Sequence, residues 1–306
     1  MRVAVRPYIW MLVGSFSFSW MGVLAHAVGS SDRHNLDWQT VAIFRSFIPL
    51  VIVGAWAIVA GVPLVFWKPR ILWMRSIAGS CSLVGTFFAL TRLPISDVFT
   101  LTNMFPVWVA LLSWPMLGAF PSAKVWLSVA CGAAGVVLIQ RPHLAEGNFA
   151  ALVAVSVSVF TALAMIGLHR LKGIDTRAVV VHFSAVSLLF ATAAFFVFPR
   201  HSDSLALDGR QIAQLLGVGL TATLGQICLT TAFTTGDPAK ISVVGLTQIV
   251  FALILDAAVL HHPLDPEKLL GIPLVIGPTA WLMLRQAPPG EGFSDEPLET
   301  TPNISE

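Results

Sequence analysis

The amino-acid sequence predicts an all-α membrane protein with about ten transmembrane helices, arranged as an inverted repeat of two five-helix bundles. Three observations carry this prediction. Hydrophobic residues make up 56% of the chain and charged residues only 11%, whereas a soluble domain carries about 25% charged residues. The apolar residues form continuous runs of roughly 20, the length of a membrane-spanning helix. Features of the first half of the chain also recur in the second half.

Ten apolar runs are expected to cross the membrane. Continuous runs favour helices over a barrel, whose strands would show segments of about ten residues with alternating polarity. In chain order the expected spans are residues 8–27, 38–60, 71–91, 94–117, 122–140, 148–168, 177–198, 210–232, 239–261 and 266–285.

The first run has a rival interpretation. Arg2 and Arg6 precede it and it ends in Ala25-His26-Ala27, a pattern that also fits a cleaved signal peptide. The run is long for a signal core and contains two tryptophans, so we favour a retained span.

The basic residues of the loops predict that both termini lie in the cytoplasm, because cytoplasmic loops carry an excess of Lys and Arg. The cytoplasmic segments would then hold Arg2, Arg6, Lys68, Arg70, Arg75, Lys124, Arg170, Lys172, Arg177, Lys240 and Arg285. The outer segments would hold Arg33, Arg92, Arg141, Arg200, Arg210 and Lys268. Residues 286–306 are acidic and rich in proline, so we expect a disordered cytoplasmic tail.

An internal repeat relates the two halves of the chain. The segment Pro106-Val-Trp-Val-Ala-Leu-Leu112 aligns with Gln248-Ile-Val-Phe-Ala-Leu-Ile254, and the same offset places Gly135 on Gly277. Five helices per copy is an odd number, so the second copy enters the membrane in the opposite orientation. An inverted repeat of this kind is typical of secondary transporters.

Four short motifs carry a resemblance to a known family. They are Arg45-Ser46-Phe47, Leu93-Pro94-Ile-Ser-Asp97, Pro106-Val-Trp-Val-Ala110, and Thr223-Leu-Gly-Gln226 followed by Ala232. With the ten-helix plan, they make residues 8–285 similar to the EamA branch of the drug/metabolite transporter superfamily. The resemblance implies EamA-like five-helix repeats at 8–140 and 148–285, a central cavity, alternating access, and transport driven by a gradient. It also implies no ATP-binding site, and no P-loop motif occurs.

The chain also departs from the family pattern. The family often carries a Gly-Glu pair after the fourth and ninth spans, but Gly118 is followed by Ala119 here, and the second copy reads His261-His262. Asp256 stands where the family usually has a small or apolar residue. These departures bear on coupling and on substrate class.

Two ionisable residues inside the expected spans are candidates for coupling or gating. Arg45 and Asp256 lie at similar expected depths, roughly 10 Å and 8 Å from the outer side, and have opposite charges. Because a charge within a membrane helix is costly, we expect them to pair as an outer gate, an anion-binding point or a proton-coupling point. The alternatives are a static ion pair and snorkelling of Arg45 to the headgroups.

Uncharged polar and aromatic residues complete the predicted site. Amides and hydroxyls can hold a polar solute, and aromatic faces suit amphiphilic or cationic ligands. The alternative role for these side chains is packing or hydrogen bonding between helices. The substrate-binding candidates are Thr102, Asn103, Gln226, Gln248, Trp20 and Trp108.

These features predict a secondary active transporter that exports or exchanges a small metabolite across the cytoplasmic (inner) membrane. A nucleotide-sugar or other organic-anion carrier is the alternative, and a membrane-embedded enzyme is less expected because no nucleophile–base cluster occurs. We expect membrane lipid and a small-molecule substrate as partners, leave a coupling proton or ion and a homodimer open, and expect no nucleic acid. Cys81, Cys131 and Cys228 lie in separate apolar runs, so no metal site or disulfide is expected, and no cofactor is expected.

Overall fold

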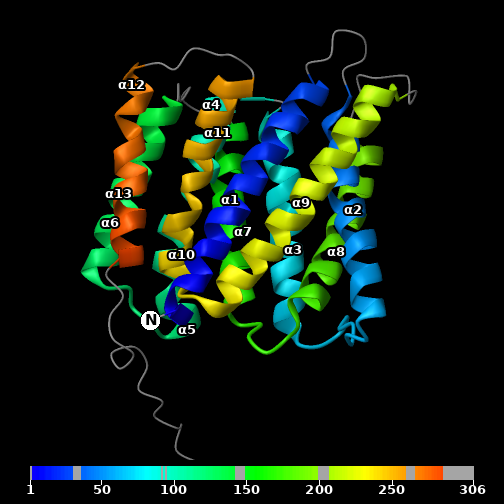
Figure 1. Cartoon of the computed structure of the whole chain (residues 1–306), viewed down its shortest axis with the longest axis horizontal. Coiled ribbons are helices and arrows are strands. Elements are labelled where there is room, and N and C mark those ends of the chain that lie inside the picture. Colours follow the sequence, from blue (N-terminus) through cyan, green and yellow to red (C-terminus); the bar gives the residue numbers. More distant parts are fainter. Residues whose placement is uncertain are drawn as a thin grey trace, which may run out of the picture.

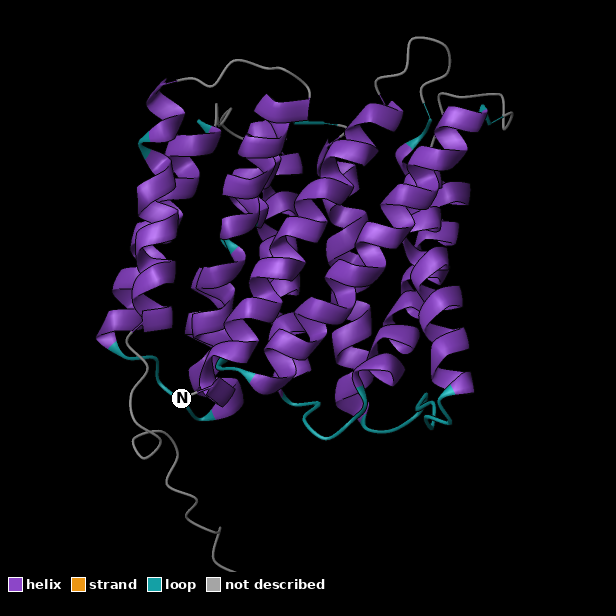
Figure 2. Cartoon of the chain, viewed as in Figure 1, coloured by secondary structure: helices purple, strands orange, loops and turns teal. Residues whose placement is uncertain are grey.

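A computed structural model describes residues 2–29, 36–90, 92–93, 95–141, 149–198, 207–259 and 266–284. These residues form helices and connecting turns without a β-strand (Figures 1 and 2), which confirms the predicted all-α class. The helices are α1 (Arg2–Gly29), α2 (Trp38–Val59), α3 (Arg70–Leu90), α4 (Ile95–Thr102), α5 (Phe105–Leu117), α6 (Ala123–Gln140), α7 (Phe149–His169), α8 (Thr176–Val197), α9 (Gly209–Thr235), α10 (Pro238–Gly245), α11 (Thr247–Val259), α12 (Pro266–Leu269) and α13 (Gly271–Leu284).

Nine segments of the described ranges are long and apolar enough to cross a membrane. The last expected span is shorter than predicted, because α12 and α13 replace a continuous helix from 266 to 285. The acidic segment 286–306 lies outside the described residues. The connections α2–α3, α5–α6, α7–α8 and α9–α10 lie at the end of the bundle where α1 begins (Figure 1). We call this end the N-terminal face.

The helix packing follows a pseudo-two-fold pattern. If the helices of the second repeat are matched to those of the first, α7 corresponds to α1, α8 to α2, and α9 to α3. The contact α1–α9 then matches α7–α3, and α2–α9 matches α8–α3. The contacts α2–α8 and α6–α13 each join two equivalent helices. This pattern is the one expected for an inverted repeat.

The two repeats exchange their first helices. α1 packs chiefly on α9, α11 and α10, which all belong to the second repeat. In the same way, α7 packs chiefly on α3, α5 and α4 of the first repeat. The blue ribbon of α1 accordingly lies between the yellow α9 and the gold α11 in Figure 1.

The expected spans 94–117 and 239–261 are each broken in the middle. α4 gives way to α5 at Asn103 and Met104, and α10 gives way to α11 at Leu246. The repeat offset places Asn103 on Gly245 and Met104 on Leu246, so both repeats break at the same position. Discontinuous helices at equivalent positions are typical of transporters built from inverted repeats.

Side chains bond to backbone carbonyls at both breaks. Ser19 Oγ donates to the carbonyl oxygen of Gln248 at 2.7 Å, and Ser15 Oγ lies 3.5 Å from that of Gly245. Asn103 Nδ2 donates to the carbonyl oxygen of Phe99 at 2.8 Å. Backbone groups within a bilayer need partners inside the protein, and at the α10–α11 break the serines of α1 add such partners.

The crossing of α6 and α13 depends on a glycine at the start of α13. A Cβ atom added to Gly271 would lie 2.6 Å from the carbonyl oxygen of Gly135 and 2.6 Å from Ile139 Cγ1. A Cβ atom on Gly277 of the same helix would have nothing within 4 Å. Gly271 therefore permits a close approach of the two helix backbones, whereas Gly277 does not serve this purpose.

We expect Gly271→Ala to lower the thermal unfolding midpoint of the detergent-solubilised protein. Overpacking of this kind costs about 1–3 kcal/mol, because the nearest atom is a rigid carbonyl oxygen. Gly277→Ala is the matched control, and we expect it to leave the midpoint unchanged or raise it, since alanine favours the helix by about 1 kcal/mol. A drop of equal size in both variants would contradict this interpretation of the crossing.

Candidate functional site: a central pocket with buried arginines

A small pocket lies between α2, α8 and α9. Its volume is about 10 Å³, which is room for one water molecule. Ser187 is eleven residues into the 22-residue α8, so the pocket lies near the middle of that helix. The lining residues are Arg45, Ser46, Pro49, Phe183, Ser184, Ser187, Ala222 and Gln226.

Equivalent turns of the two repeats build this pocket. Arg45 and Phe183 each lie seven residues after the first residue of their helices, α2 and α8. The same count pairs Ser46 with Ser184, and all four residues line the pocket. The repeats therefore contribute matching serines but different larger side chains, a guanidinium group from one and an aromatic ring from the other.

Arg45 is half-buried in the bundle. Its Nε donates to Met21 Sδ at 3.3 Å, and a thioether is only a weak acceptor. Among the described residues, the pocket wall around Arg45 contains hydroxyl, amide, aromatic and proline groups and no carboxylate. Its positive charge therefore lacks an acidic partner in the pocket.

Arg75 is the main functional candidate that sequence reasoning missed. The count of loop charges places it with the cytoplasmic segments, whereas the structure buries it inside the bundle. Arg75 lies on α3 with 1% of its surface exposed, and its Cζ lies 4.1 Å from the centroid of the Phe183 ring. Within the described part of the chain, its Nε and Nη1 are buried and have no hydrogen-bond partner.

Two glycines make room for Arg75. Its Nη1 lies against Gly79, one helical turn further along α3. A Cβ atom on Gly167 of α7 would lie 3.2 Å from Arg75 Cβ. The sequence did hold a signal, since Arg75 falls inside the expected span 71–91 and Gly79 follows one turn later.

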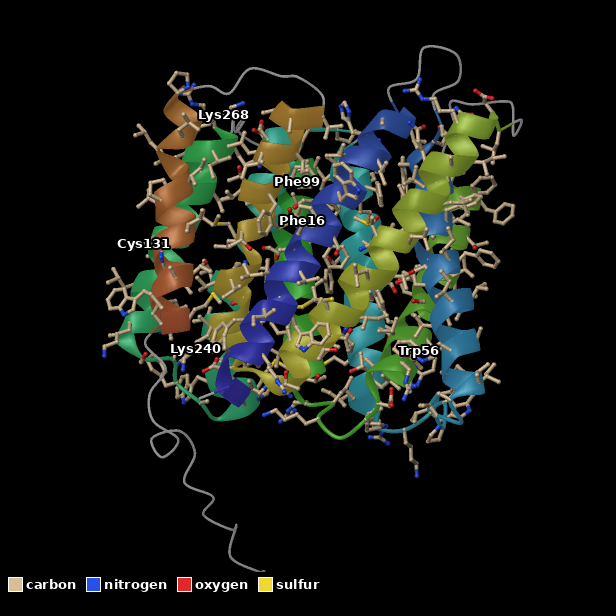
Figure 3. All side chains as sticks on the ribbon, in the orientation of Figure 1. Phe16, Trp56, Phe99, Cys131, Lys240 and Lys268 are labelled. Atoms are coloured by element: carbon tan, nitrogen blue, oxygen red, sulfur yellow. The ribbon has the colours of Figure 1, made fainter. Side chains whose placement is uncertain are left out.

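A larger cavity opens at the N-terminal face. It has a volume of about 940 Å³, comparable with ligand-binding clefts. Trp56 of α2, which is labelled near this face in Figure 3, lines it. Trp56 lies seven residues beyond Pro49, or about 10 Å along the helix. The cavity therefore lies beyond the central pocket on the same helices, and Ile227, which also lines it, directly follows Gln226.

An ion pair at the start of α8 lies at the mouth of this cavity. Arg177 Nε donates to Asp175 Oδ1 at 2.9 Å, and Arg177 Nη2 donates to Asp175 Oδ2 at 2.7 Å. The Arg177 Cζ lies 4.9 Å from the centroid of the Trp56 ring. Asp175 also caps α8 by accepting from the backbone N–H of Arg177 at 2.8 Å. These contacts tie the start of α8 to the end of α2.

Asp175→Asn should reveal the pH dependence of this ion pair. The hydrogen bonds from Arg177 lower the pKa of the Asp175 carboxyl, so its stabilisation is present above the ordinary carboxyl pKa and is lost as the pH falls through the lowered value. Asparagine still caps the helix but lacks the charge. We expect wild type to unfold at a slightly higher temperature at pH 7, since an exposed pair stabilises little, and the two midpoints to converge as the pH falls below the lowered pKa.

A difference between the midpoints of wild type and Asp175→Asn that stays constant as the pH falls from 7 through the lowered pKa would contradict an electrostatic origin. Glu296→Gln, in the acidic terminal segment, is a charge-matched control. Its unfolding midpoint should change with pH as that of wild type does.

The structure brings two of the predicted site residues together. Arg45 and Gln226 line the same central pocket. The expected pair of Arg45 with Asp256 is not formed. The Arg45 guanidinium contacts Met21, and α2 packs on α8 and α9, whereas α11, which carries the half-buried Asp256, packs on α1, α10 and α13. Similar depth in the membrane does not place two residues on facing sides of their helices.

The remaining predicted residues lie elsewhere. Thr102 and Asn103 lie at the α4–α5 break, where their side chains lie 3.5 Å and 2.8 Å from the carbonyl oxygen of Phe99. Gln248 adjoins the α10–α11 break, and its backbone carbonyl accepts from Ser19. Trp108 packs against the largest apolar cluster, and Trp20 is half-buried on α1. None of these five residues lines the central pocket.

The helical bundle, its apolar spans and its repeated halves define a multi-pass membrane protein of the transporter class. A model of the EamA-like transporter family matches residues 5–141 and again residues 148–284. The chain therefore belongs to the EamA-like transporter family.

Relatives named as transport proteins agree with this class. The chain is 28% identical over 245 residues to the pseudopaline exporter CntI of Pseudomonas aeruginosa, covering 78% of this chain and 82% of the exporter. It is 26% identical over 253 residues to the probable transport protein YPL264C of Saccharomyces cerevisiae, covering 74% and 72% of the two chains. A solved crystal structure at 18% identity matches with a TM-score of 0.76, covering 90% of this chain and 97% of that one, and shares its fold.

Proposed function

We propose that this protein is a secondary active transporter that exports a small metabolite across the cytoplasmic membrane by alternating access. The observation that supports the proposal is the polar central pocket, which is built from equivalent turns of two inverted repeats. An open cavity lies on the same helices, between this pocket and the N-terminal face. A substrate site at the junction of the repeats, near mid-membrane, is where transporters of this architecture bind their substrates.

The open cavity gives the proposed direction. We propose that the N-terminal face is cytoplasmic, which makes the present conformation inward-facing. Lys172 and Arg177 line the cavity and Lys240 lies near the same face, in agreement with the excess of basic residues on cytoplasmic surfaces. A solute would enter from the cytoplasm, reach Gln226 and Arg45, and leave when the helices around the pocket rearrange.

The coupling of transport to a gradient belongs to the same proposal. Asp256 is a half-buried carboxyl on the second broken helix pair, and an ionisable group in a transmembrane segment is a candidate for a proton relay. We propose that it takes part in coupling or gating without contacting Arg45 in the present conformation.

Ligand binding and flux would test the proposal together. The thermal unfolding midpoint of the purified protein would be measured with amino acids, amines, nucleosides, sugar phosphates and nucleotide sugars. A ligand at 100 times its dissociation constant stabilises the folded protein by about 2.7 kcal/mol. Each binder would then be loaded into proteoliposomes for counterflow with and without an imposed proton gradient. We expect the binder to cross the membrane chemically unchanged.

Recovery of a chemically altered binder would favour an enzyme over a transporter. Binding without any counterflow would likewise overturn the proposal. Asp256→Asn should retain counterflow but lose the response to the proton gradient, and an unchanged response would remove Asp256 from the coupling mechanism.

A further inference from the structure

The buried Arg75 guanidinium has N–H groups that the described residues leave without a hydrogen-bond partner. Arg75 is 1% exposed, and in the described part of the chain its Nε and Nη1 have no hydrogen-bond partner. Removing a charge from water is costly unless the charge is paired and hydrogen-bonded. The chain satisfies another arginine well, because Arg177 makes two hydrogen bonds with Asp175 and stacks on Trp56. The contrast indicates that Arg75 has a partner that the polypeptide does not supply.

Arg75 and Arg45 both lie next to Phe183. Arg45 and the Phe183 ring line one pocket, and that ring also contacts the Arg75 guanidinium. An empty site with two like charges is unfavourable, and a group of negative charge between them would remove the repulsion.

The other polar groups around the pocket suit an anion. Ser184 and Ser187 line it with hydroxyl groups, Ser187 Oγ lies 3.0 Å from Ser80 Oγ on α3, and Gln226 adds an amide. No carboxylate of the described ranges lines the pocket. Guanidinium groups bind carboxylate and phosphate oxygens in a two-pronged geometry, and hydroxyl and amide N–H groups supplement them.

We propose that the central pocket binds the oxyanion of the transported metabolite, a carboxylate or phosphate group, between Arg45 and Arg75, and that the Phe183 ring moves to uncover Arg75. This inference rests on the proposed transport function and adds the substrate class. The movement is required because the present pocket holds only about 10 Å³. The open cavity on the same helices provides the route of entry.

Matched ligand pairs would test the oxyanion directly. Thermal unfolding of the purified protein would be followed with succinate against succinamide and with glucose 6-phosphate against glucose. We expect at least one acid to raise the midpoint and its uncharged analogue to leave it unchanged. A shift with succinate would identify a carboxylate as the bound group, and a shift with glucose 6-phosphate would identify a phosphate. If neither acid shifts the wild-type midpoint, the proposal is overturned.

Variants of Arg75 separate ligand binding from a structural role. Arg75→Met should raise the midpoint of the empty protein, since it removes an unpaired buried charge, and should abolish the shift caused by the acid. Arg75→Lys should restore part of the shift by restoring the charge. Arg45→Gln should weaken the shift, whereas Arg92→Gln, at an exposed arginine near the opposite face, should retain it. An Arg75→Met protein that is less stable when empty and keeps the full shift would show that Arg75 serves packing alone.

Counterflow distinguishes failure of this inference from failure of the transport proposal. An acid that binds wild type through Arg75 but does not cross proteoliposomes would support the oxyanion site and overturn transport. A neutral or cationic solute that crosses equally well in wild type and Arg75→Met would support transport and overturn the oxyanion site.

Discussion

Ala222→Leu should reduce counterflow to the level of empty liposomes. Ala222 lies in the wall of the central pocket and is 3% exposed. A leucine adds three carbon atoms beside a pocket of about 10 Å³, so the added side chain would occupy the space that the substrate needs. Counterflow of the ligand identified by binding is the measurement, with the unfolding midpoint recorded in parallel.

The midpoint matters because overpacking also costs stability, about 1–3 kcal/mol. A variant that folds, melts within that range of wild type and carries no flux places the pocket on the transport path. Leu224→Ala is the matched control on α9, because Leu224 is 49% exposed on the outer side of the same helix, and its flux should match that of wild type. Undiminished flux in Ala222→Leu would remove the pocket from the path.

Thr235→Cys should make transport sensitive to a membrane-impermeant thiol reagent from one side only. Thr235 is exposed at the end of α9 and lines the open cavity. Cys81, Cys131 and Cys228 would first be replaced by alanine, so that the new thiol is the single target. A bulky charged adduct in the cavity should abolish most of the flux, because the route to the central pocket passes through it.

The sidedness of this reaction tests the proposed orientation. We expect the reagent to react in inverted vesicles and not in intact cells. Leu224→Cys, which faces away from the cavity, should react in neither preparation. Reaction of Thr235→Cys in intact cells would place the N-terminal face outside, and lack of reaction in both preparations would show that the cavity is closed in the membrane.

The sequence predicts most of the fold because span length and apolarity are local properties. It does not reveal the breaks at Asn103 and Leu246, since both lie within apolar runs that remain long enough to cross a membrane without interruption. The hydrogen bonds that compensate for the second break come from Ser15 and Ser19, more than 200 residues away in the chain. No local pattern connects these serines to the break.

The candidate site was predicted in part for a similar reason. A polar residue inside an apolar run is visible in the sequence, and Arg45 and Gln226 were found in this way. Whether such a residue faces a particular neighbour depends on helix rotation and on residues from other helices. The sequence therefore places Arg75 with the cytoplasmic segments, although Gly79 and Gly167 make a buried position possible for it, and it suggests a pair of Asp256 with Arg45.

The exchange of first helices has a consequence for the synthesis of the protein. The chief neighbours of α1 are α9, α10 and α11, so α1 emerges from the ribosome some 180 residues before the first of them, as the interval from Gly29 to Gly209 shows. During that interval its buried serines and its apolar surface meet lipid or the insertion machinery instead of their final neighbours. The native fold is therefore completed late, when the second half of the chain closes around a helix that was made first.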